Sequence, residues 1–315
     1  MAAVTRVARV HAEGMRLSVW PSLFQPWSEL LATARHADAT GWDRVYVADH
    51  FMGMPGGPFP VETPTLEAGT MAGALGAVTE RVRIGTLVYG NTYRHPAVLA
   101  NMAATADHVS EGRFVLGMGA GWQENEHEAY GIDLPPVGER VSRFDEAVQL
   151  VRSLLTQPVT NFEGKHYRLT EARCEPKPVQ ARLPILIGAS GDRMLGITAR
   201  HADEWNTWGL PGHIAERSAA LDRACEAAGR DPSEIARSCQ AVVLFTADDA
   251  RGEELMSRPG RPIMAGTPGR LRDVLARYAE IGVDELIVPD GTFGTGQAKL
   301  DGLSRFATEV ASDFR

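Results

Sequence analysis

The chain has 315 residues, of which 44% are hydrophobic, so it is long enough to bury a large core. A formal net charge of −8 and the absence of any Lys/Arg-rich run argue against a nucleic-acid-binding surface. No stretch of about 18 apolar residues occurs, so the sequence predicts no membrane span.

The chain ends and the cysteines suggest one cytoplasmic domain. Residues 1–14 carry Arg and His where a signal peptide would be apolar, so they are predicted to be a short tail before a single domain of residues 15–315. The three cysteines show no Cys-x-x-Cys spacing, which is typical of incidental thiols in a reducing compartment. They are Cys174, Cys225 and Cys239. We expect neither disulfides nor a zinc site.

Short apolar runs alternate with longer segments of helical periodicity along the domain. The predicted strands are residues 15–20, 44–49, 82–88, 113–119, 184–189, 204–209, 239–245 and 285–289. Their near-continuous apolar character is typical of parallel strands that are covered on both faces. Eight units of strand followed by helix predict a protein of the α/β class with a (β/α)8 TIM barrel.

Individual glycine, proline and threonine residues predict where several of the intervening helices begin or end. The helix after the first strand is predicted to stop at Gly41, and the helix after the third strand to begin at Pro96. The helix before the last strand has Thr267 as its predicted N-cap, Pro268 in its first turn and Gly282 at its end.

Two connections are longer than a barrel needs. More than 60 residues separate the fourth and fifth strands, which predicts an insertion region with a hairpin and a Pro-rich return at 161–180. A second long connection, 246–266, follows the seventh strand. Loops of this length usually serve function. The alternative, a doubly wound sheet, is disfavoured because GMGAGW is not the G-x-G-x-x-G fingerprint and occurs only at the fourth unit.

In a TIM barrel the active site is built at the carboxyl ends of the strands. The residues predicted there are mainly aromatic residues and glycines with few charges, a set that suits a flat heteroaromatic ligand. They include Trp20, Asp49, His50, Phe51, Val88, Tyr89, Gly90, Gly119, Ala120, Gly121, Trp122, Gly188 and Trp208.

The segment IGASGDRML places small residues between a strand and a helix that begins near residues 191–192. Free backbone N–H groups at a helix start attract an anion, so the segment is a candidate phosphate site. The alternative is a plain tight turn with Ser190 as N-cap.

Asp49 and His50 follow the second strand and could both turn toward a ligand. A histidine that titrates near neutrality can accept or donate a proton, although the alternative is a hydrogen-bonded structural residue. A metal is not expected, because the cluster of His201, Asp203 and Glu204 falls at the amino end of the sixth strand, the stability face. No H-E-x-x-H, G-x-S-x-G or P-loop motif is present.

Five segments, in this order along the chain, resemble those of the bacterial luciferase-like flavin and deazaflavin oxidoreductases. They are GWDRVYVADHF, RVRIGTLVYGNTYRHPAVLANMAATADHVSEGRFVLGMGAGW, FEGKHYRLTEARCEPKPVQARLPILIGASG, ARHADEWN and GTPGRLRDVLARYAEIGVDELIVP. The resemblance covers almost all of residues 15–289. GAGW followed by ENE, and IGASGDRML followed by ARHADEWN, are more similar to the branch that binds coenzyme F420 than to the branch that binds FMN.

The resemblance implies an F420-dependent oxidoreductase that transfers a hydride between C5 of the deazaflavin and a small organic substrate. It also implies a TIM barrel with an insertion after the fourth strand, a homodimer, and a non-proline cis peptide at Leu87–Val88 beneath the cofactor ring. The residues implied in cofactor binding are Asp49, Val88, Gly90, Ala120, Gly121, Asn125, Gly188, Ala189, Ser190 and Gly191.

The resemblance also implies roles around the reacting atoms. His50, with Asp49 beside it, is the candidate catalytic pair. The glutamate that serves as acid in some relatives is replaced by Trp122, which argues against the sugar-phosphate dehydrogenase subgroup. The sequence leaves open whether Glu124 and Glu126 face the site. Candidate walls of the substrate pocket are Trp20, Phe51, Trp122 and Trp208.

Charged residues at the expected rim are candidates to attract the anionic tail of F420. They are Arg94, Lys165 and Arg193. The main alternative is an FMN-dependent monooxygenase that uses O2 and reduced flavin, since both cofactors present a tricyclic ring and a phosphate. A second alternative is a barrel that only binds flavin. The sequence identifies neither the substrate nor the direction of the reaction.

Overall fold

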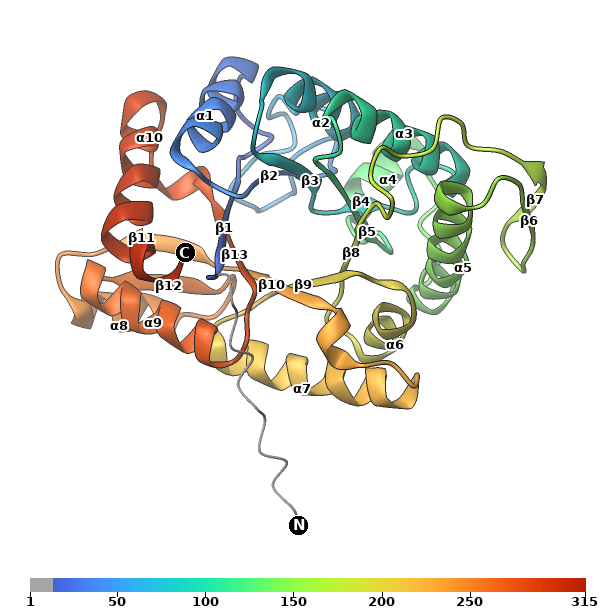
Figure 1. The fold of residues 1–315 in the computed structure, drawn as a ribbon. Helices are drawn as coiled ribbons and strands as arrows, with labels where there is room; N and C mark the ends of the chain where they lie inside the picture. The colour runs from blue at the N-terminus through green and yellow to red at the C-terminus, as the bar shows by residue number, and fades with distance from the viewer. Residues whose placement is uncertain (1–13) are drawn as a thin grey trace, which may run out of the picture.

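The computed structural model describes residues 14–315, so the predicted tail at 1–14 lies outside the described residues except for its last residue. Eight parallel strands form a barrel that the pairing of β3 with β5 closes (Figure 1). The barrel strands are β1 (Arg16–Trp20), β2 (Arg44–Val47), β3 (Arg83–Thr86), β5 (Phe114–Gly119), β8 (Ile185–Gly188), β9 (Glu204–Trp208), β10 (Ala236–Gln240) and β13 (Glu285–Pro289). The predicted (β/α)8 TIM barrel is confirmed.

Helices follow the strands around the outside of the barrel. They are α1 (Trp27–Thr40), α2 (Ala68–Val78), α3 (Pro96–Val109), α5 (Val137–Thr156), α6 (Asp192–His201), α7 (Pro211–Ala227), α9 (Pro268–Glu280) and α10 (Gly296–Arg305). Three predicted ends are confirmed: Gly41 caps α1 with φ 75°, Pro96 opens α3, and Thr267 accepts the Arg270 N–H at the start of α9. The C-cap of α9 is Ile281, and the predicted Gly282 follows it with φ 74°. Short helical turns complete the chain at η1 (Pro232–Glu234), η2 (Asp290–Thr292), η3 (Phe306–Val310) and η4 (Ser312–Phe314).

The predicted insertion after the fourth barrel strand is also confirmed. It adds α4 (Glu124–Tyr130) before α5 and an antiparallel hairpin, β6 (Thr160–Glu163) and β7 (Arg168–Ala172), after it. The hairpin stands at the edge of the molecule, away from the barrel strands (Figure 1). A two-residue strand, β4 (Tyr89–Gly90), pairs with the end of β5.

The predicted seventh strand, 239–245, is wrong in its bounds. The barrel strand β10 ends at Gln240, and the same apolar run then leaves the barrel as β11 (Val242–Phe245). β11 pairs in parallel with β12 (Ile263–Gly266), which follows α8 (Asp249–Met256). The apolar residues of the predicted strand lie mostly in β11, whereas β10 has the sequence ARSCQ, and an apolar run does not specify which partner a strand takes.

The inside of the barrel is filled in layers. Near the amino ends of the strands, Arg44 forms buried ion pairs with Glu204 and Glu285. This network confirms that Glu204 belongs to the stability face. Above it lies an apolar layer whose members come from five strand regions, with Trp20 and Val88 packed against it. The members are Tyr46, Leu87, Val115, Leu186 and Ile287. The barrel is therefore a packed core whose upper surface is Trp20 and Val88.

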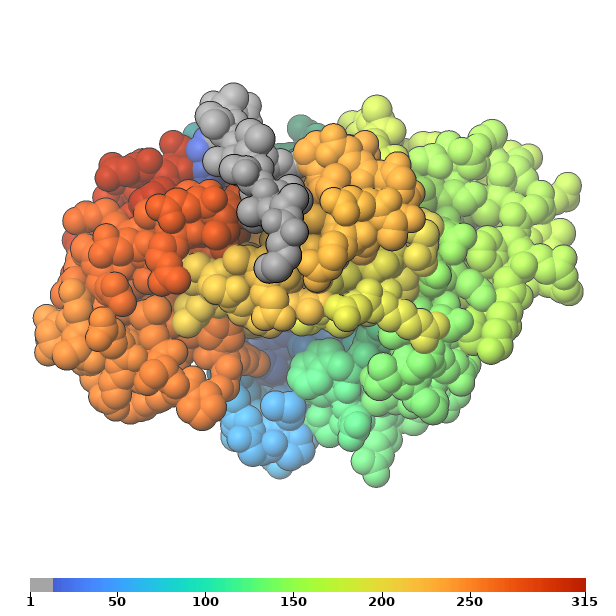
Figure 2. Space-filling model, turned by 90° about the horizontal axis from the view of Figure 1, so that it is seen from below, coloured from blue at the N-terminus to red at the C-terminus, as the bar shows by residue number. Residues whose placement is uncertain are grey.

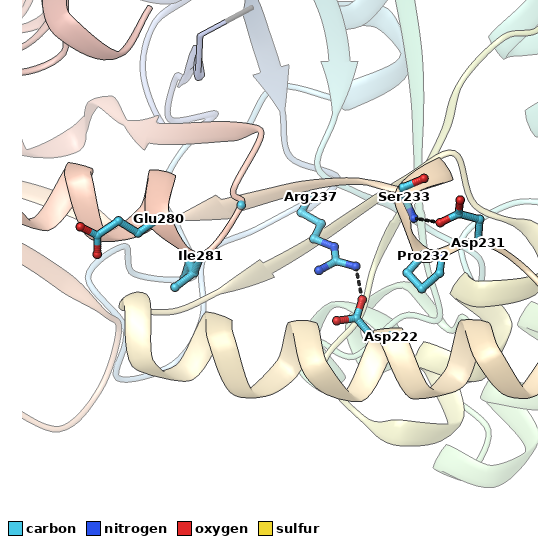
Figure 3. Close-up of a pocket in the computed structure, with 8 residues that line it drawn as sticks. Asp222, Asp231, Pro232, Ser233, Arg237, Glu280 and Ile281 are labelled. Atoms are coloured by element: carbon cyan, nitrogen blue, oxygen red, sulfur yellow. Dashed lines mark hydrogen bonds and ion pairs between the residues drawn. The ribbon is translucent and has the colours of Figure 1, made fainter. Parts of the chain in front are cut away.

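One outer side of the molecule carries α7 across its centre, flanked by the C-terminal elements in orange and the insertion after β5 in green (Figure 2). A hollow of about 220 Å³ lies at the amino ends of the strands, between α7, η1 and the end of α9 (Figure 3). There the Arg237 side chain reaches Asp222 (Figure 3). Because this end of a barrel serves stability, we do not assign the hollow to catalysis. No helix among residues 14–315 is long and apolar enough to cross a membrane.

Candidate active site

The floor of the candidate site is formed where the chain bulges between β3 and β4. The non-proline cis peptide at Leu87–Val88 is present, as the resemblance implied. The Val88 side chain lies over three glycines of neighbouring strands. A Cβ atom would approach a Val88 methyl carbon to 3.1 Å at Gly117, 2.7 Å at Gly119 and 3.3 Å at Gly188. These glycines therefore provide the room that the Val88 side chain occupies.

Asp49 lies at the end of β2 and holds the bulge in place. Its carboxylate accepts two hydrogen bonds from Arg94, at 2.7 and 2.9 Å, and one from the Gly90 N–H at 2.8 Å. Burial acts to lower the pKa of Arg94, but the contact with Asp49 outweighs it and raises the pKa. Because both of its oxygens accept hydrogen bonds from Arg94, Asp49 positions the bulge, and its predicted catalytic role stays a prediction.

Arg94 is therefore not a free cation at the rim, and this prediction is wrong. Its side chain is only 12% exposed, it forms an ion pair with Asp49, and its guanidinium lies 4.7 Å from the centre of the Tyr89 ring. The sequence alone does not reveal this pairing, because Asp49 lies 45 positions before Arg94 in the chain.

His50 is the titratable side chain next to the floor, and its partner is Glu126. The distance from His50 Nδ1 to Glu126 Oε1 is 2.7 Å, and Glu126 Oε2 accepts the Phe51 N–H at 2.7 Å. Tyr93 donates its hydroxyl hydrogen to the same carboxylate. The Glu126 side chain is fully buried, whereas the His50 side chain is 21% exposed. The pair thus joins a buried acid to an imidazole that reaches solvent.

The hydrogen bonds around Glu126 keep it ionised. Burial acts to raise the pKa of Glu126, but the hydrogen bonds from His50, the Phe51 N–H and Tyr93 outweigh burial and lower the pKa below its usual range. Burial, and then Glu126, raise the pKa of Tyr93, so Tyr93 stays a neutral donor. A carboxylate with this number of donors can stabilise a positive charge on the neighbouring imidazole.

The candidate phosphate loop connects β8 to α6. Gly191 is the N-cap of α6 and no side chain caps this helix, so the predicted alternative with Ser190 as N-cap is wrong. The loop is fixed from β9: the Ala189 N–H donates to the Asn206 carbonyl at 3.0 Å, and Trp205 Nε1 donates to the Ala189 carbonyl at 2.8 Å. A Cβ at Gly191 would meet no atom within 4 Å. The helix start is thus open and provides free N–H groups.

Aromatic side chains surround the floor, as expected, but they divide into two groups. Trp20 and Trp208 meet above the barrel with ring centres 5.6 Å apart, and the Arg261 guanidinium lies 5.4 Å from the centre of the Trp208 ring. Trp122 lies beside His50, with ring centres 5.5 Å apart, and is 56% exposed. Trp20, Trp122 and Trp208 are therefore positioned to form walls of a substrate pocket above the floor.

Phe51 belongs to a different aromatic cluster. Its ring packs against Tyr93 at 4.9 Å and stacks on Tyr130 at 5.1 Å between ring centres. His127 in turn stacks on Tyr93 at 4.6 Å. Phe51 therefore helps to attach α4 to the loop after β2, and its predicted role as a pocket wall stays a prediction.

In the turn after β5 the backbone of Gly121 lies close to the Thr92 side chain. Gly121 has φ 86°, and a Cβ there would lie 2.4 Å from Thr92 Oγ1, so no other residue fits without a rearrangement. Its carbonyl accepts a hydrogen bond from Arg140 at 2.9 Å. Ala120 is half-buried beside it. Asn125 donates to the Gly53 carbonyl at 3.0 Å, so this side chain secures α4, and its predicted contact with the cofactor stays a prediction.

The structure therefore brings together most of the predicted site residues and adds one that the sequence did not assign. Glu126, left open by the sequence, turns inward and contacts His50. The available signal was its position on a helix that begins directly after the glycine motif of β5. Lys165 and Arg193 are exposed, and Arg193 donates to the Gly138 carbonyl at 2.9 Å. Within residues 14–315 no group of three potential metal ligands is found.

Comparisons with known proteins point to one family and one fold. A family model described as luciferase-like monooxygenase matches residues 3–282. The chain is 36% identical over 230 residues to the F420-dependent glucose-6-phosphate dehydrogenase of Nakamurella multipartita, which covers 71% of this chain and 66% of that enzyme. It is 31% identical over 183 residues to pyrimidine monooxygenase RutA of Allorhizobium ampelinum, which covers 56% of this chain and 49% of that enzyme.

A solved structure supports the fold. The coenzyme F420-dependent tetrahydromethanopterin reductase of Methanopyrus kandleri superimposes with a TM-score of 0.79 at 17% identity, and the match covers 96% of this chain and all of that one. At this level of identity the superposition establishes a shared fold.

Proposed function

This chain belongs to the luciferase-like monooxygenase family, and from that premise we propose that it is an oxidoreductase that uses coenzyme F420. The observation that carries the cofactor is the 36% identity to an F420-dependent dehydrogenase over 71% of the chain. The open start of α6, together with a glycine-bordered floor at the same end of the barrel, supports a ligand that combines a flat ring with a phosphate.

The residues that would hold F420 fit its chemical groups. The phosphate would lie against the loop formed by Gly188, Ala189, Ser190 and Gly191 and be bound by the uncapped N–H groups at the start of α6, since the Ala189 N–H is already donated to Asn206. The ring would lie on Val88, bordered by Gly90, Ala120, Gly121 and Asn125. When bound, F420 supplies a carbon that accepts or gives a hydride. The protein contributes orientation and a water-poor floor made by Val88 and Trp20.

His50 is the residue that we propose to move the substrate proton. Oxidation of an alcohol releases a proton from its hydroxyl group as the hydride leaves carbon, and the reverse reaction takes the proton back. His50 can accept that proton on Nε2 and give it back, and the buried carboxylate of Glu126 stabilises the imidazolium that forms. Asp49, through Gly90 and Arg94, would keep the floor in position while this occurs.

The substrate pocket would be bordered by Trp20, Trp122 and Trp208. Flat, half-exposed aromatic walls favour an apolar or planar organic substrate. We do not extend the sugar-phosphate substrate of the relative to this chain, because Trp122 stands where the resemblance places an acid.

Cofactor titration of the purified protein tests the proposal. We expect F420 to bind tightly and FMN weakly. Gly191→Val should weaken F420 binding at least about tenfold, because the new side chain extends into the open space at the start of α6. Gly212→Val is the matched control, since a Cβ there also meets nothing within 4 Å but lies on α7. Tight FMN retention without F420 binding would support the monooxygenase alternative, which the match to RutA favours.

We propose in addition that the protein forms a homodimer. Valines 78, 98 and 109, on or at the ends of α2 and α3, are 38%, 53% and 41% exposed, and single apolar side chains of this kind on adjacent helices suit a modest self-complementary contact. Light scattering during size exclusion measures the mass directly. A monomeric mass at micromolar concentration would refute this part of the proposal.

A further inference from the structure

We propose that Glu126 is a positioning residue that holds His50 in the Nδ1–H form and so makes Nε2 the atom that exchanges a proton with the substrate. The inference deepens the proposed function and rests on it only for the identity of the substrate proton. The arrangement of His50 and Glu126 is a property of the protein alone and can be measured without any cofactor.

The proton between the two side chains belongs to the imidazole. Glu126 accepts three hydrogen bonds, from His50 Nδ1, the Phe51 N–H and the Tyr93 hydroxyl. Oε2 accepts from the Phe51 amide, and Oε1 is shared by His50 Nδ1 and the Tyr93 hydroxyl. A carboxyl hydrogen on Oε1 would leave it one contact fewer to accept, whereas the ionised carboxylate accepts all three, and these hydrogen bonds lower the pKa of Glu126 below its usual range. An ionised carboxylate has no hydrogen to give, and therefore His50 must donate through Nδ1. A neutral His50 then carries its lone pair on Nε2.

Nε2 is the ring nitrogen that is left for a ligand. Within the described part of the chain no hydrogen bond joins His50 Nε2 to another protein group, and the side chain keeps 21% of its surface exposed. The ring lies edge-on to Trp122, one of the proposed pocket walls. A substrate hydroxyl that reaches His50 from the mouth of the barrel meets the unprotonated nitrogen, which is the arrangement a general base needs.

Glu126 is held in this orientation by the helix that carries it. On either side of it along α4, Asn125 donates to the Gly53 carbonyl at 3.0 Å, and His127 Nε2 lies 2.7 Å from Thr92 Oγ1. Gln123, the N-cap of α4, donates to the Met52 carbonyl at 3.2 Å. These contacts attach the start of the insertion to the loops after β2 and β3. The insertion thus supplies the carboxylate that orients the imidazole at the end of β2.

A purely structural role for Glu126 predicts something different. In that case the carboxylate would serve only to hold the loop through the Phe51 N–H, and the protonation pattern of the His50 ring would not depend on it. The two roles are separated by the tautomer of His50, because a loop tether has no effect on which ring nitrogen carries the hydrogen.

The experiment is nitrogen-15 NMR of the histidine rings in the protein without cofactor, at a pH where His50 is neutral. The His50 signals are assigned by their loss in His50→Gln. We expect wild type to show a protonated Nδ1 and an unprotonated Nε2. Glu126→Leu removes the acceptor and should shift the population toward Nε2–H, Glu126→Asp should restore Nδ1–H, and Glu124→Gln, an exposed acid on the same helix, should leave the ring unchanged.

Two results would overturn the inference. One is a wild-type spectrum with the hydrogen on Nε2, which decides the matter even if Glu126→Leu does not fold. The other is a folded Glu126→Leu protein that retains the Nδ1–H pattern. F420 titration of the same samples separates this inference from the proposed function: wild type that shows the Nδ1–H ring but binds no F420 contradicts the function and supports the role of Glu126.

Discussion

Gly119→Ala provides a direct test of how the floor is built. Gly119 is buried in β5, and a Cβ there would lie 2.7 Å from one methyl carbon of Val88. Apart from the Cβ of Val88 at 3.9 Å, no other non-neighbouring atom of the described chain lies within 4 Å of that position. The substitution therefore overpacks one contact, and the Val88 side chain alone must move.

The expected cost follows from that contact. Overpacking of a well-packed site costs about 1–3 kcal/mol. Replacing a glycine by alanine recovers about 0.4–1 kcal/mol from the unfolded chain where the backbone accepts alanine. We expect Gly119→Ala to lower the free energy of unfolding by about 1–2 kcal/mol. Val88→Ala removes both methyl carbons, so in that background Gly119→Ala should cost nothing and even stabilise slightly, which corresponds to a coupling of about 1–3 kcal/mol.

Urea unfolding, monitored by tryptophan fluorescence, gives the free energy of unfolding of each variant from the midpoint and slope of its transition. The cycle consists of wild type, the two single variants and the double variant. The control is Gly73→Ala on α2, where a Cβ would meet nothing within 4 Å, and this substitution should stabilise the fold by about 0.5–1 kcal/mol. If Gly119→Ala costs the same, within about 0.5 kcal/mol, in the presence and absence of the Val88 methyl groups, the proposed packing of the floor is incorrect.

Three further predictions follow from the charges and thiols. Arg94→Met leaves the buried Asp49 carboxylate without its ion-pair partner and should cost about 3–5 kcal/mol in thermal or urea unfolding, whereas the exposed Arg193→Gln should change little. Because the folded-state pKa of Glu126 is lowered, its ionisation stabilises the fold above the usual glutamate pKa of about 4.3, and the stability gap between wild type and Glu126→Gln should shrink as the pH falls through the folded pKa. All three cysteines are buried, and burial raises the pKa of each thiol, so native protein should resist alkylation that denatured protein undergoes; rapid labelling of the native thiols would contradict their burial.

The local parts of the fold were predictable because local chemistry decides them. Gly41 stops α1 in a left-handed conformation that other residues adopt only at a cost, and Pro96 opens α3 because its ring presets the helical φ. Eight apolar runs alternating with helical periodicity identified the barrel, since parallel strands that are covered on both faces require such runs. The open turn before α6 was predictable for the same reason, as small residues and a helix start are adjacent in sequence; its phosphate-binding role stays a prediction.

The errors arose where a partner lies far along the chain. The run at 239–245 was assigned to one strand, but Val242 pairs with Ile263 outside the barrel. Arg94 was placed at the rim, although it is paired with Asp49. In each case the residue type was compatible with both environments, and the choice depended on a neighbour that the local sequence does not contain.

Local sequence was enough to predict a TIM barrel, the ends of its strands except the seventh, and the placement of His50 and the turn before α6 at one end of the barrel. Which side chains meet there depends on the folded chain: Asp49 accepts hydrogen bonds from Arg94 and the Gly90 N–H, and Glu126 contacts His50. The physical reason is that propensity and periodicity act over a few residues, whereas ion pairs and hydrogen bonds in a closed barrel join residues tens of positions apart. Their energies depend on burial and on distance in space, and the fold sets both.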